Sequence, residues 1–267
     1  MVRVPEHRDR EQLRTTFDRV SEQYDAARPT YPAALFDDLV ELARIPPGGR
    51  ILEIGPGTGK ATVALAERGF DVLGVELGSR LAEVARRRLA GFPHAEIVVA
   101  DFEQLEPERA EFDAVVAFTS FHWIAPELRY TKPARLLRPG GALAVAAAEH
   151  VLAGGRDDDF WLEVQEDYDA VVPHPDNGPP GPPADAEDWG EQIEASGLYG
   201  EVLSRRHLWN VEYTADEYIA VLGTYSPNLA LPDEQREELF RRIHARVAAR
   251  GTVEKTYLGM LNVARKS

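Results

Sequence analysis

The sequence contains no cysteine, which excludes several kinds of chemistry at once. Without thiols the chain has no disulfide, no thiolate metal site, no iron–sulfur cluster and no cysteine nucleophile. The seven histidines form no HExxH pattern or comparable cluster, so we expect no catalytic metal. No run approaches the roughly 20 apolar residues of a membrane span, and the charged N-terminal segment lacks the apolar stretch of a secretory signal. These absences predict a cytoplasmic protein without a membrane segment.

Basic residues are also few relative to acidic ones. The chain has 30 lysines and arginines against 45 aspartates and glutamates, a net charge of −15. Nucleic-acid-binding proteins usually carry a basic surface because neutralising phosphates supplies most of their non-specific affinity. The longest basic cluster, Arg86 to Arg88, lies in a helical pattern and is best explained as a solvated helix face. We therefore expect a small-molecule substrate rather than a nucleic acid, handled by a monomer or homodimer.

What the sequence does contain is an alternation of short apolar runs and amphipathic helical patterns between Arg50 and Val145. This alternation is typical of βαβ units and a parallel sheet covered by helices on both faces. The expected strands are residues 51–54, 71–75, 96–100, 112–118 and 141–147, with helices at 61–69, 79–91 and 126–141 between them.

Further elements flank this region. We expect helices at 8–24, 32–43, 157–172, 185–196, 214–222 and 232–250, strands at 201–211 and 253–264, and an irregular proline- and glycine-rich loop at 173–183. The predicted fold is α/β: a Rossmann-like, seven-stranded mixed sheet of five parallel strands and a final pair, in which the last strand inserts antiparallel, with a small helical cap. We predict one domain over 1–267, made of N-terminal helices (1–45), a cofactor-binding core (46–150), and a cap insertion with C-terminal strands and helices (151–267).

The most informative segment is the glycine-rich turn after the first strand, ILEIGPGTGK (51–60). Glycines at alternate positions let the backbone turn sharply and approach a ligand without a Cβ in the way. Nicotinamide-binding proteins favour G-x-G-x-x-G, in which the helix N-terminus faces a pyrophosphate. Here the spacing is G-x-G-x-G, and Glu53 lies two residues before it. A carboxylate there repels a pyrophosphate but suits a ligand that carries an ammonium and a sulfonium.

Two further acids follow neighbouring strands. Glu76 ends the second strand, where it can accept hydrogen bonds from ribose hydroxyls, and Asp101 ends the third, within reach of an adenine amine. One acid at a strand end is as easily a helix N-cap or a turn residue. Three acids, each at the carboxyl end of an adjacent parallel strand, predict a binding site for a positively charged nucleoside.

The segments ILEIGPGTGK, GVELGSR, VVADFEQL, FDAVVAFTSFHWI and LLRPGGALAV resemble the successive motifs of class I S-adenosylmethionine-dependent methyltransferases. The resemblance is strongest to the methyltransferase-11 type, which includes trans-aconitate methyltransferase, and covers about residues 15 to 150. It implies S-adenosylmethionine as cofactor and S-adenosylhomocysteine as product. The residues that it implies for cofactor binding are Tyr24, Arg28, Tyr31, Glu53, Gly55, Pro56, Gly57, Gly59, Glu76, Leu77, Asp101, Phe102, Phe118 and Ser120. For Tyr24, Arg28 and Tyr31 a packing role between two helices is equally compatible.

On the acceptor side the candidate catalytic residue is His122, just after the fourth strand. A hydroxyl or ammonium acceptor must lose a proton and His is the usual base, whereas a carboxylate needs none. The alternative, which we favour, is that His122 and Trp123 form the pocket wall. Phe121, Trp123, Trp161 and Tyr225 are the predicted substrate-binding residues, and each large aromatic can equally be a core residue.

The expected function is methyl transfer to a carboxylate or hydroxyl oxygen of a small molecule, less readily to N or C. The segment FTSF lacks the Asn/Asp-Pro-Pro-Tyr/Phe motif of amino-directed methyltransferases. Three alternatives remain: a tRNA-modifying methyltransferase, which the net charge opposes; an NAD(P)-dependent oxidoreductase, which the glycine spacing opposes; and a non-catalytic cofactor-binding protein.

Overall fold

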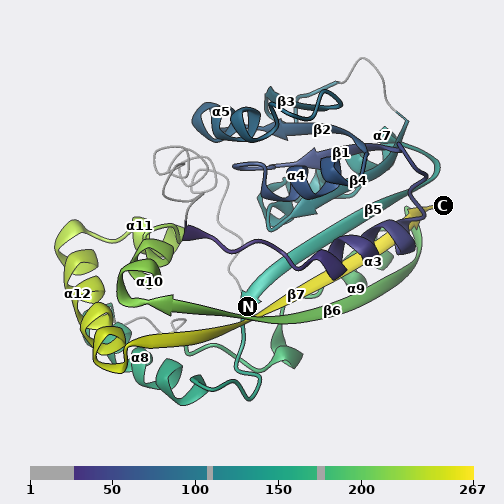
Figure 1. Ribbon diagram of the computed structural model, residues 1–267. Helices are drawn as coiled ribbons and strands as arrows, with labels where there is room; N and C mark the ends of the chain where they lie inside the picture. The colour runs from purple at the N-terminus through teal and green to yellow at the C-terminus, as the bar shows by residue number, and fades with distance from the viewer. Residues whose placement is uncertain (1–26, 107–110, 173–177) are drawn as a thin grey trace.

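The computed structural model describes residues 27–106, 111–172 and 178–267, and it contains one seven-stranded mixed sheet (Figure 1). The order across the sheet is β3-β2-β1-β4-β5-β7-β6. The strands are β1 (Arg50–Ile54), β2 (Asp71–Glu76), β3 (Ala95–Val99), β4 (Phe112–Phe118), β5 (Leu137–His150), β6 (Tyr199–Thr214) and β7 (Thr252–Lys266). The predicted sheet is confirmed, including the antiparallel insertion of the last strand between β5 and β6.

The strand order fixes where a ligand can bind. Strands β1 to β5 pair in parallel, and the chain runs outward from β1 to β3 on one side, then from β4 to β5 on the other. The order therefore reverses between β1 and β4. In open α/β sheets, ligands bind in the crevice at the carboxyl ends of the strands where such a reversal occurs.

Both faces of the sheet are buried, because successive residues of the parallel strands are apolar. Ile51 packs on one face with the helices α3 (Ala33–Ala43) and α4 (Lys60–Glu67). The next residue, Leu52, packs on the opposite face with α7 (Thr131–Leu136) and α9 (Gly190–Ala195). Helix α5 (Ser79–Arg88) covers β3 beside α4.

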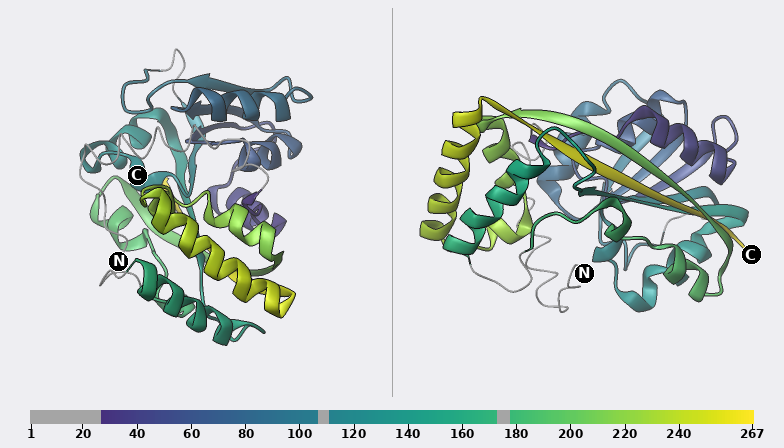
Figure 2. Two further views of the ribbon diagram at one scale, coloured as in Figure 1. Left: turned by 90° about the vertical axis from the view of Figure 1, so that its left-hand side faces the viewer. Right: turned by 90° about the horizontal axis from the view of Figure 1, so that it is seen from below.

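A separate group of helices lies beyond the ends of β6 and β7, where these long strands leave the rest of the sheet (Figures 1 and 2). This group, called the cap here, consists of α8 (Asp158–Val171), α10 (Ala215–Leu222), α11 (Ser226–Leu229) and α12 (Asp233–Arg250). Its own apolar core joins Phe160 and Trp161 of α8 to Tyr218 of α10, Ile243 of α12 and Tyr257 of β7.

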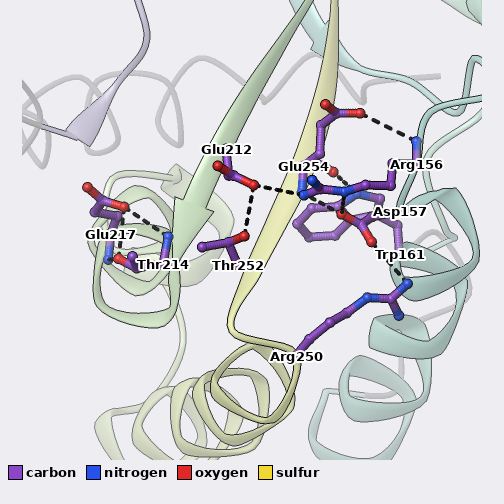
Figure 3. A network of polar contacts seen from close by, with 9 residues as sticks. All are labelled: Arg156, Asp157, Trp161, Glu212, Thr214, Glu217, Arg250, Thr252 and Glu254. Carbon is purple, nitrogen blue, oxygen red and sulfur yellow. Dashed lines mark hydrogen bonds and ion pairs between the residues drawn. The ribbon is translucent and has the colours of Figure 1, made fainter.

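A polar network attaches the cap to the two long strands (Figure 3). The buried Asp157 accepts hydrogen bonds from the Glu254 backbone N–H at 2.8 Å and from Arg156 at 3.0 Å, and forms an ion pair with Arg250 at 2.9 Å. At the start of α10, Thr214 and Glu217 form a reciprocal capping box.

Some predicted helices were wrong in extent. Residues 126–141, predicted as one helix, form α6 (Pro126–Arg129) and α7, and the rest belongs to β5. Pro133 explains the break, because it has no N–H to donate to the Arg129 carbonyl in a continuous helix. The helix predicted at 185–196 is a short 3-10 turn, η2 (Pro183–Asp185), followed by α9. The predicted helix at 8–24 lies outside the described residues.

Candidate active site

Two adjoining cavities lie at the carboxyl ends of β1 to β4, and they share the glycine turn and Arg28. The larger, about 310 Å³, is lined by Arg28, Ile54, Gly55, Gly57, Val75, Glu76, Leu77, Leu81, Ala100, Asp101, Phe102, Phe118, Thr119, Ser120, His122, Trp123, Ile124 and Tyr225. The smaller, about 100 Å³, includes Tyr31, Glu53, Pro56 and Lys60. The structure thus gathers most of the predicted site residues around one space. Tyr24 lies outside the described residues.

The glycine turn places bare backbone against the cavities. Gly55 and Gly57 have φ angles of +64° and +58°, a region that side chains rarely adopt. A Cβ on Gly55 would lie 2.9 Å from the Ser120 Cβ, so the segment after β4 leaves no room there, whereas a Cβ on Gly57 would enter open space. Gly59 does not line either cavity; its Cβ would meet Ala85 of α5 at 3.1 Å. Its role in this structure is close packing at the start of α4.

Glu76, at the end of β2, joins the glycine turn to the start of α5. One carboxylate oxygen accepts the Gly57 N–H and the other accepts the Gly78 N–H, both at 2.8 Å. A carboxylate offers about four acceptor positions, so these two bonds leave capacity for further donors from the cavity.

Glu53 is the most buried of the three acids, at 1% exposure. Its Oε2 has no hydrogen-bond partner in the part of the chain that the structure describes, and the residue lines the smaller cavity. Burial, opposed by Thr62 and reinforced by the nearby Glu76 carboxylate, raises the pKa of Glu53 to about 7. An unpartnered buried carboxylate beside a cavity is suited to a cationic group of a ligand.

Asp101 and Phe102 follow β3 and line the larger cavity. The Asp101 Oδ1 accepts the Glu103 N–H at 2.9 Å, a local turn that holds the carboxylate in place. Phe102 is buried, while Leu77 is 40% exposed at the cavity edge. Together they give this part of the cavity an apolar lining with a hydrogen-bond acceptor beside it.

The residues that follow β4 form another part of the cavity wall. The Ser120 hydroxyl donates to the Ile54 carbonyl, and Tyr31 is hydrogen-bonded to Thr119. Thr119 has a φ of +54°, which is unusual for a β-branched residue and turns the chain sharply out of β4. Lys60 donates to the Arg28 carbonyl and so ties the N-terminal segment to the glycine turn.

His122 lies in the 3-10 turn η1 (Phe121–Trp123) and lines the larger cavity. Burial, with a contribution from the Arg129 guanidinium, lowers the pKa of His122 to about 4. The imidazole is therefore neutral at pH 7 and is a weak proton acceptor. The Trp123 ring lies beside it, with centroids 4.7 Å apart.

The cap reaches the cavity through Tyr225, in the turn between α10 and α11. Arg28 donates to the Thr224 hydroxyl at 2.8 Å, and its guanidinium lies 4.0 Å from the centroid of the Tyr225 ring. The structure thus engages Arg28 with the cap, while its contact with the cofactor stays a prediction.

Two predicted substrate-binding residues line neither cavity. Phe121 is 1% exposed and packs edge-on against Trp189, at 5.1 Å between ring centroids. Trp161 belongs to the cap core and donates to the Glu254 carbonyl at 2.8 Å (Figure 3). In each case the aromatic surface that suggested a contact with substrate is buried against other elements of the protein.

Several residues around the cavities were not predicted from the sequence. Thr119, Thr58, Lys60, Ala148, Trp209 and Tyr257 contribute to the walls. Trp209 and Tyr257 come from β6 and β7, far along the chain from the glycine turn. Lys60 and Thr58 lie inside the glycine motif itself, which was the available signal for them.

Residues 51–141 match the model of the family described as methyltransferase domain. Over these residues the chain is therefore similar to methyltransferases. An uncharacterized methyltransferase of Mycobacterium bovis is 32% identical over 136 residues, which are 51% of this chain and 53% of that protein. The chain therefore spans about half the length of the curated relatives it matches first.

Solved structures of methyltransferases resemble this chain over a longer stretch. A structure described as a type II methyltransferase from Anaeromyxobacter dehalogenans aligns over 89% of this chain and 97% of its own, with a TM-score of 0.63 and 21% identity. A phosphoethanolamine N-methyltransferase from Haemonchus contortus, in complex with S-adenosylhomocysteine, aligns over 93% of this chain and 57% of its own, with a TM-score of 0.53 and 16% identity. At these identities the likeness shows a shared fold. None of the helices in the described ranges has the length and apolar character to cross a bilayer.

Proposed function

We propose that this protein transfers a methyl group from S-adenosylmethionine to an oxygen of a small-molecule acceptor. The observation that carries the proposal is the buried Glu53 carboxylate, whose Oε2 has no hydrogen-bond partner among the described residues, beside the bare backbone of Gly57. Glu53 can accept a cationic group of a ligand, and at Gly57 a ligand can contact the main chain.

The residues around the cavities fit the cofactor in three parts. Glu53 would receive the ammonium of its methionine part. Glu76 would accept hydrogen bonds from the ribose hydroxyls, and Asp101, with the Phe102 backbone and the Leu77 side chain, would bind the adenine. When bound, the cofactor supplies a methyl group activated by a positive sulfur.

The protein's part in the reaction is alignment and exclusion of water. An in-line displacement requires the acceptor atom about 3–3.5 Å from the methyl carbon. Phe118, Thr119, His122 and Trp123 wall the cavity between the adenine end and the cap, and Arg28 and Tyr225 cover it. Such a partly apolar enclosure suits a small organic acceptor more than a nucleic acid.

Titration calorimetry with S-adenosylhomocysteine and, separately, with NAD tests the proposal. We expect uptake of S-adenosylhomocysteine at one site and none of NAD. Binding of NAD alone would favour the oxidoreductase alternative. To separate an enzyme from a non-catalytic binding protein, the protein is incubated with S-adenosylmethionine and a metabolite mixture, and a product heavier by one methyl group is sought by mass spectrometry.

A further inference from the structure

Behind the cavity, the cap contains a buried lysine without an acidic partner. Lys255, on β7, is 2% exposed, and its Nζ donates to the Tyr225 hydroxyl at 3.0 Å. The rings of Trp161, Tyr218 and Tyr257 lie 5.1–5.8 Å from the same Nζ. Over the described ranges, no carboxylate lies within ion-pair distance of Lys255. A buried ammonium is costly unless a negative charge or strong acceptor faces it.

Tyr225 is the group that can supply that negative charge. Its hydroxyl faces Lys255, while the Arg28 guanidinium lies 4.0 Å from its ring centroid. Burial alone would raise the pKa of Tyr225, but the Lys255 ammonium and the Arg28 guanidinium outweigh it and lower the pKa to about 8.

The pKa values of the surrounding tyrosines are shifted in the opposite direction from that of Tyr225. Burial raises the pKa of Tyr168 on α8 and of Tyr213 on β6 to about 12, and raises those of Tyr218 on α10 and Tyr257 on β7 above their usual range. Burial, with Lys255 nearby, lowers the pKa of His150 on β5 to about 2, so this imidazole is neutral. Tyr225 is thus the acidic tyrosine of the cluster.

The two residues differ in their position relative to the cavities. Tyr225 lines the larger cavity together with Glu76, Asp101 and His122, whereas Lys255 lines neither cavity. A group that takes a proton from an acceptor must reach the cavity, and the charge that activates it can lie behind.

We propose that Tyr225 is the catalytic base of this enzyme and that its acceptor is a weakly acidic hydroxyl, a phenol or an enol. Lys255 and Arg28 are positioning residues that hold the phenolate form. The inference rests on the proposed function. A catalytic base favours a phenol or enol acceptor over a carboxylate, because a carboxylate carries no proton at neutral pH and leaves nothing for Tyr225 to remove.

The proton step balances as follows. The acceptor O–H gives its proton to the Tyr225 phenolate oxygen, and the electron pair left on the acceptor oxygen forms the new bond to the methyl carbon. The electron pair of the broken carbon–sulfur bond stays on the sulfur, and Tyr225 later releases the proton to solvent. A phenol, with an ordinary pKa of about 10, is close enough to Tyr225 for efficient proton transfer.

A first experiment needs no acceptor. The ultraviolet difference absorbance of tyrosinate is followed from pH 6 to pH 10 in the wild type, Tyr225→Phe and Tyr168→Phe. We expect one tyrosine to titrate near pH 8 in the wild type and in Tyr168→Phe, and to be missing in Tyr225→Phe. In Lys255→Met, or Lys255→Gln if the first variant does not fold, the midpoint should rise by about one pH unit or more. A titration near pH 8 that persists in Tyr225→Phe overturns the proposal.

A second experiment measures turnover with a panel of phenols, enols and carboxylic acids. We expect phenols or enols to be methylated, with kcat lowered about 100-fold or more by Tyr225→Phe and KM little changed. The rise of kcat with pH should move to higher pH in Lys255→Met, because the base then keeps its proton longer. Methylation of carboxylic acids alone, or an unchanged kcat in Tyr225→Phe, overturns the proposal. Calorimetry with S-adenosylhomocysteine separates this from the proposed function: if the wild type does not bind it, the proposed function fails, whatever the tyrosinate titration shows.

Discussion

Glu76 at the end of β2 and Gly57 in the turn after β1 are joined by a hydrogen bond of 2.8 Å, from the glycine amide to the carboxylate. The same carboxylate accepts the Gly78 N–H. One side chain therefore shapes the glycine turn, fixes the start of α5 and faces the cavity, so its loss affects both the shape and the chemistry of the cofactor site.

Replacing Glu76 by Ala should weaken the binding of S-adenosylhomocysteine by about 1–3 kcal/mol, the loss of charge-assisted hydrogen bonds. Calorimetry measures the change, and Glu67→Ala on the exposed end of α4 serves as the control. An affinity of Glu76→Ala equal to that of the control would remove Glu76 from the cofactor site.

Gly57 and Gly69 make a matched pair. Both have positive φ, +58° and +82°, and a Cβ on either meets nothing within 4 Å. Gly57→Ala and Gly69→Ala should therefore cost a similar amount of stability, about 1 kcal/mol. Only Gly57 lines the cavities, so only Gly57→Ala should reduce cofactor affinity. Equal affinities in the two variants would mean that the ligand does not approach the turn.

The raised pKa of Glu53 predicts a pH dependence of binding. A cationic ligand group favours the carboxylate, so affinity should rise with pH by up to tenfold per unit below about pH 7 and level off above it. The Glu53→Gln variant should show weaker binding with a flatter pH profile between pH 5 and 7. A wild-type affinity independent of pH in this range would contradict the assignment.

The same group affects the stability of the ligand-free protein in the opposite direction. The folded state keeps the Glu53 proton up to about pH 7, whereas the unfolded chain loses it near 4.5. The unfolded state therefore binds fewer protons between these values, and the free energy of unfolding falls as pH rises, by up to about 3 kcal/mol. Denaturant unfolding of the wild type and Glu53→Gln at pH 5 and pH 7.5 measures this; the difference between pH values should be smaller in the variant.

His122 should act as a wall of the cavity. Its lowered pKa, about 4, makes it a poor base at pH 7. We expect His122→Gln to reduce kcat less than tenfold and mainly to change KM for the acceptor. A loss of kcat as large as that in Tyr225→Phe would instead assign the proton transfer to His122.

Asp157 should be a stability determinant of the cap without a role in cofactor binding. It is 3% exposed and receives the Glu254 amide together with Arg156 and Arg250 (Figure 3). Asp157→Ala leaves these donors without their acceptor and should lower the free energy of unfolding by about 1–3 kcal/mol. The control is Asp159→Ala, whose side chain is exposed on the same helix. Thermal unfolding gives the comparison, and equal melting temperatures would contradict the prediction.

The sheet, and the gathering of Glu53, Glu76 and Asp101 around the cavities, were predictable from sequence because their signals are local. A strand, the glycine turn and a helix follow one another within 51–67, and Glu76 and Asp101 are each found at or just after the end of an apolar run. On the acceptor side, Phe121 and Trp161 line neither cavity, and the physical reason is different. Whether a large aromatic side chain lines a cavity or a core depends on what packs against it, here Trp189 and Glu254, far away in sequence.

The pairing of Tyr225 with Lys255 could not have been predicted either. Nothing in the segment VEKTYLGML distinguishes Lys255 from a solvated lysine on a strand. It is buried because β6 and β7 continue past the end of β5 into the aromatic core of the cap, which is a tertiary property.

The registration of β6 with β7 has a further consequence for how this protein can be altered. Thr214, the last residue of β6, lies opposite Thr252, the first residue of β7. Everything between them, including α10, α11, α12 and the tyrosine that covers the cavity, is an excursion that leaves and re-enters the sheet at a single rung. A foreign loop of different shape could be grafted between those two threonines with the strand pairing intact, so that acceptor selectivity could be redesigned separately from the nucleoside cradle.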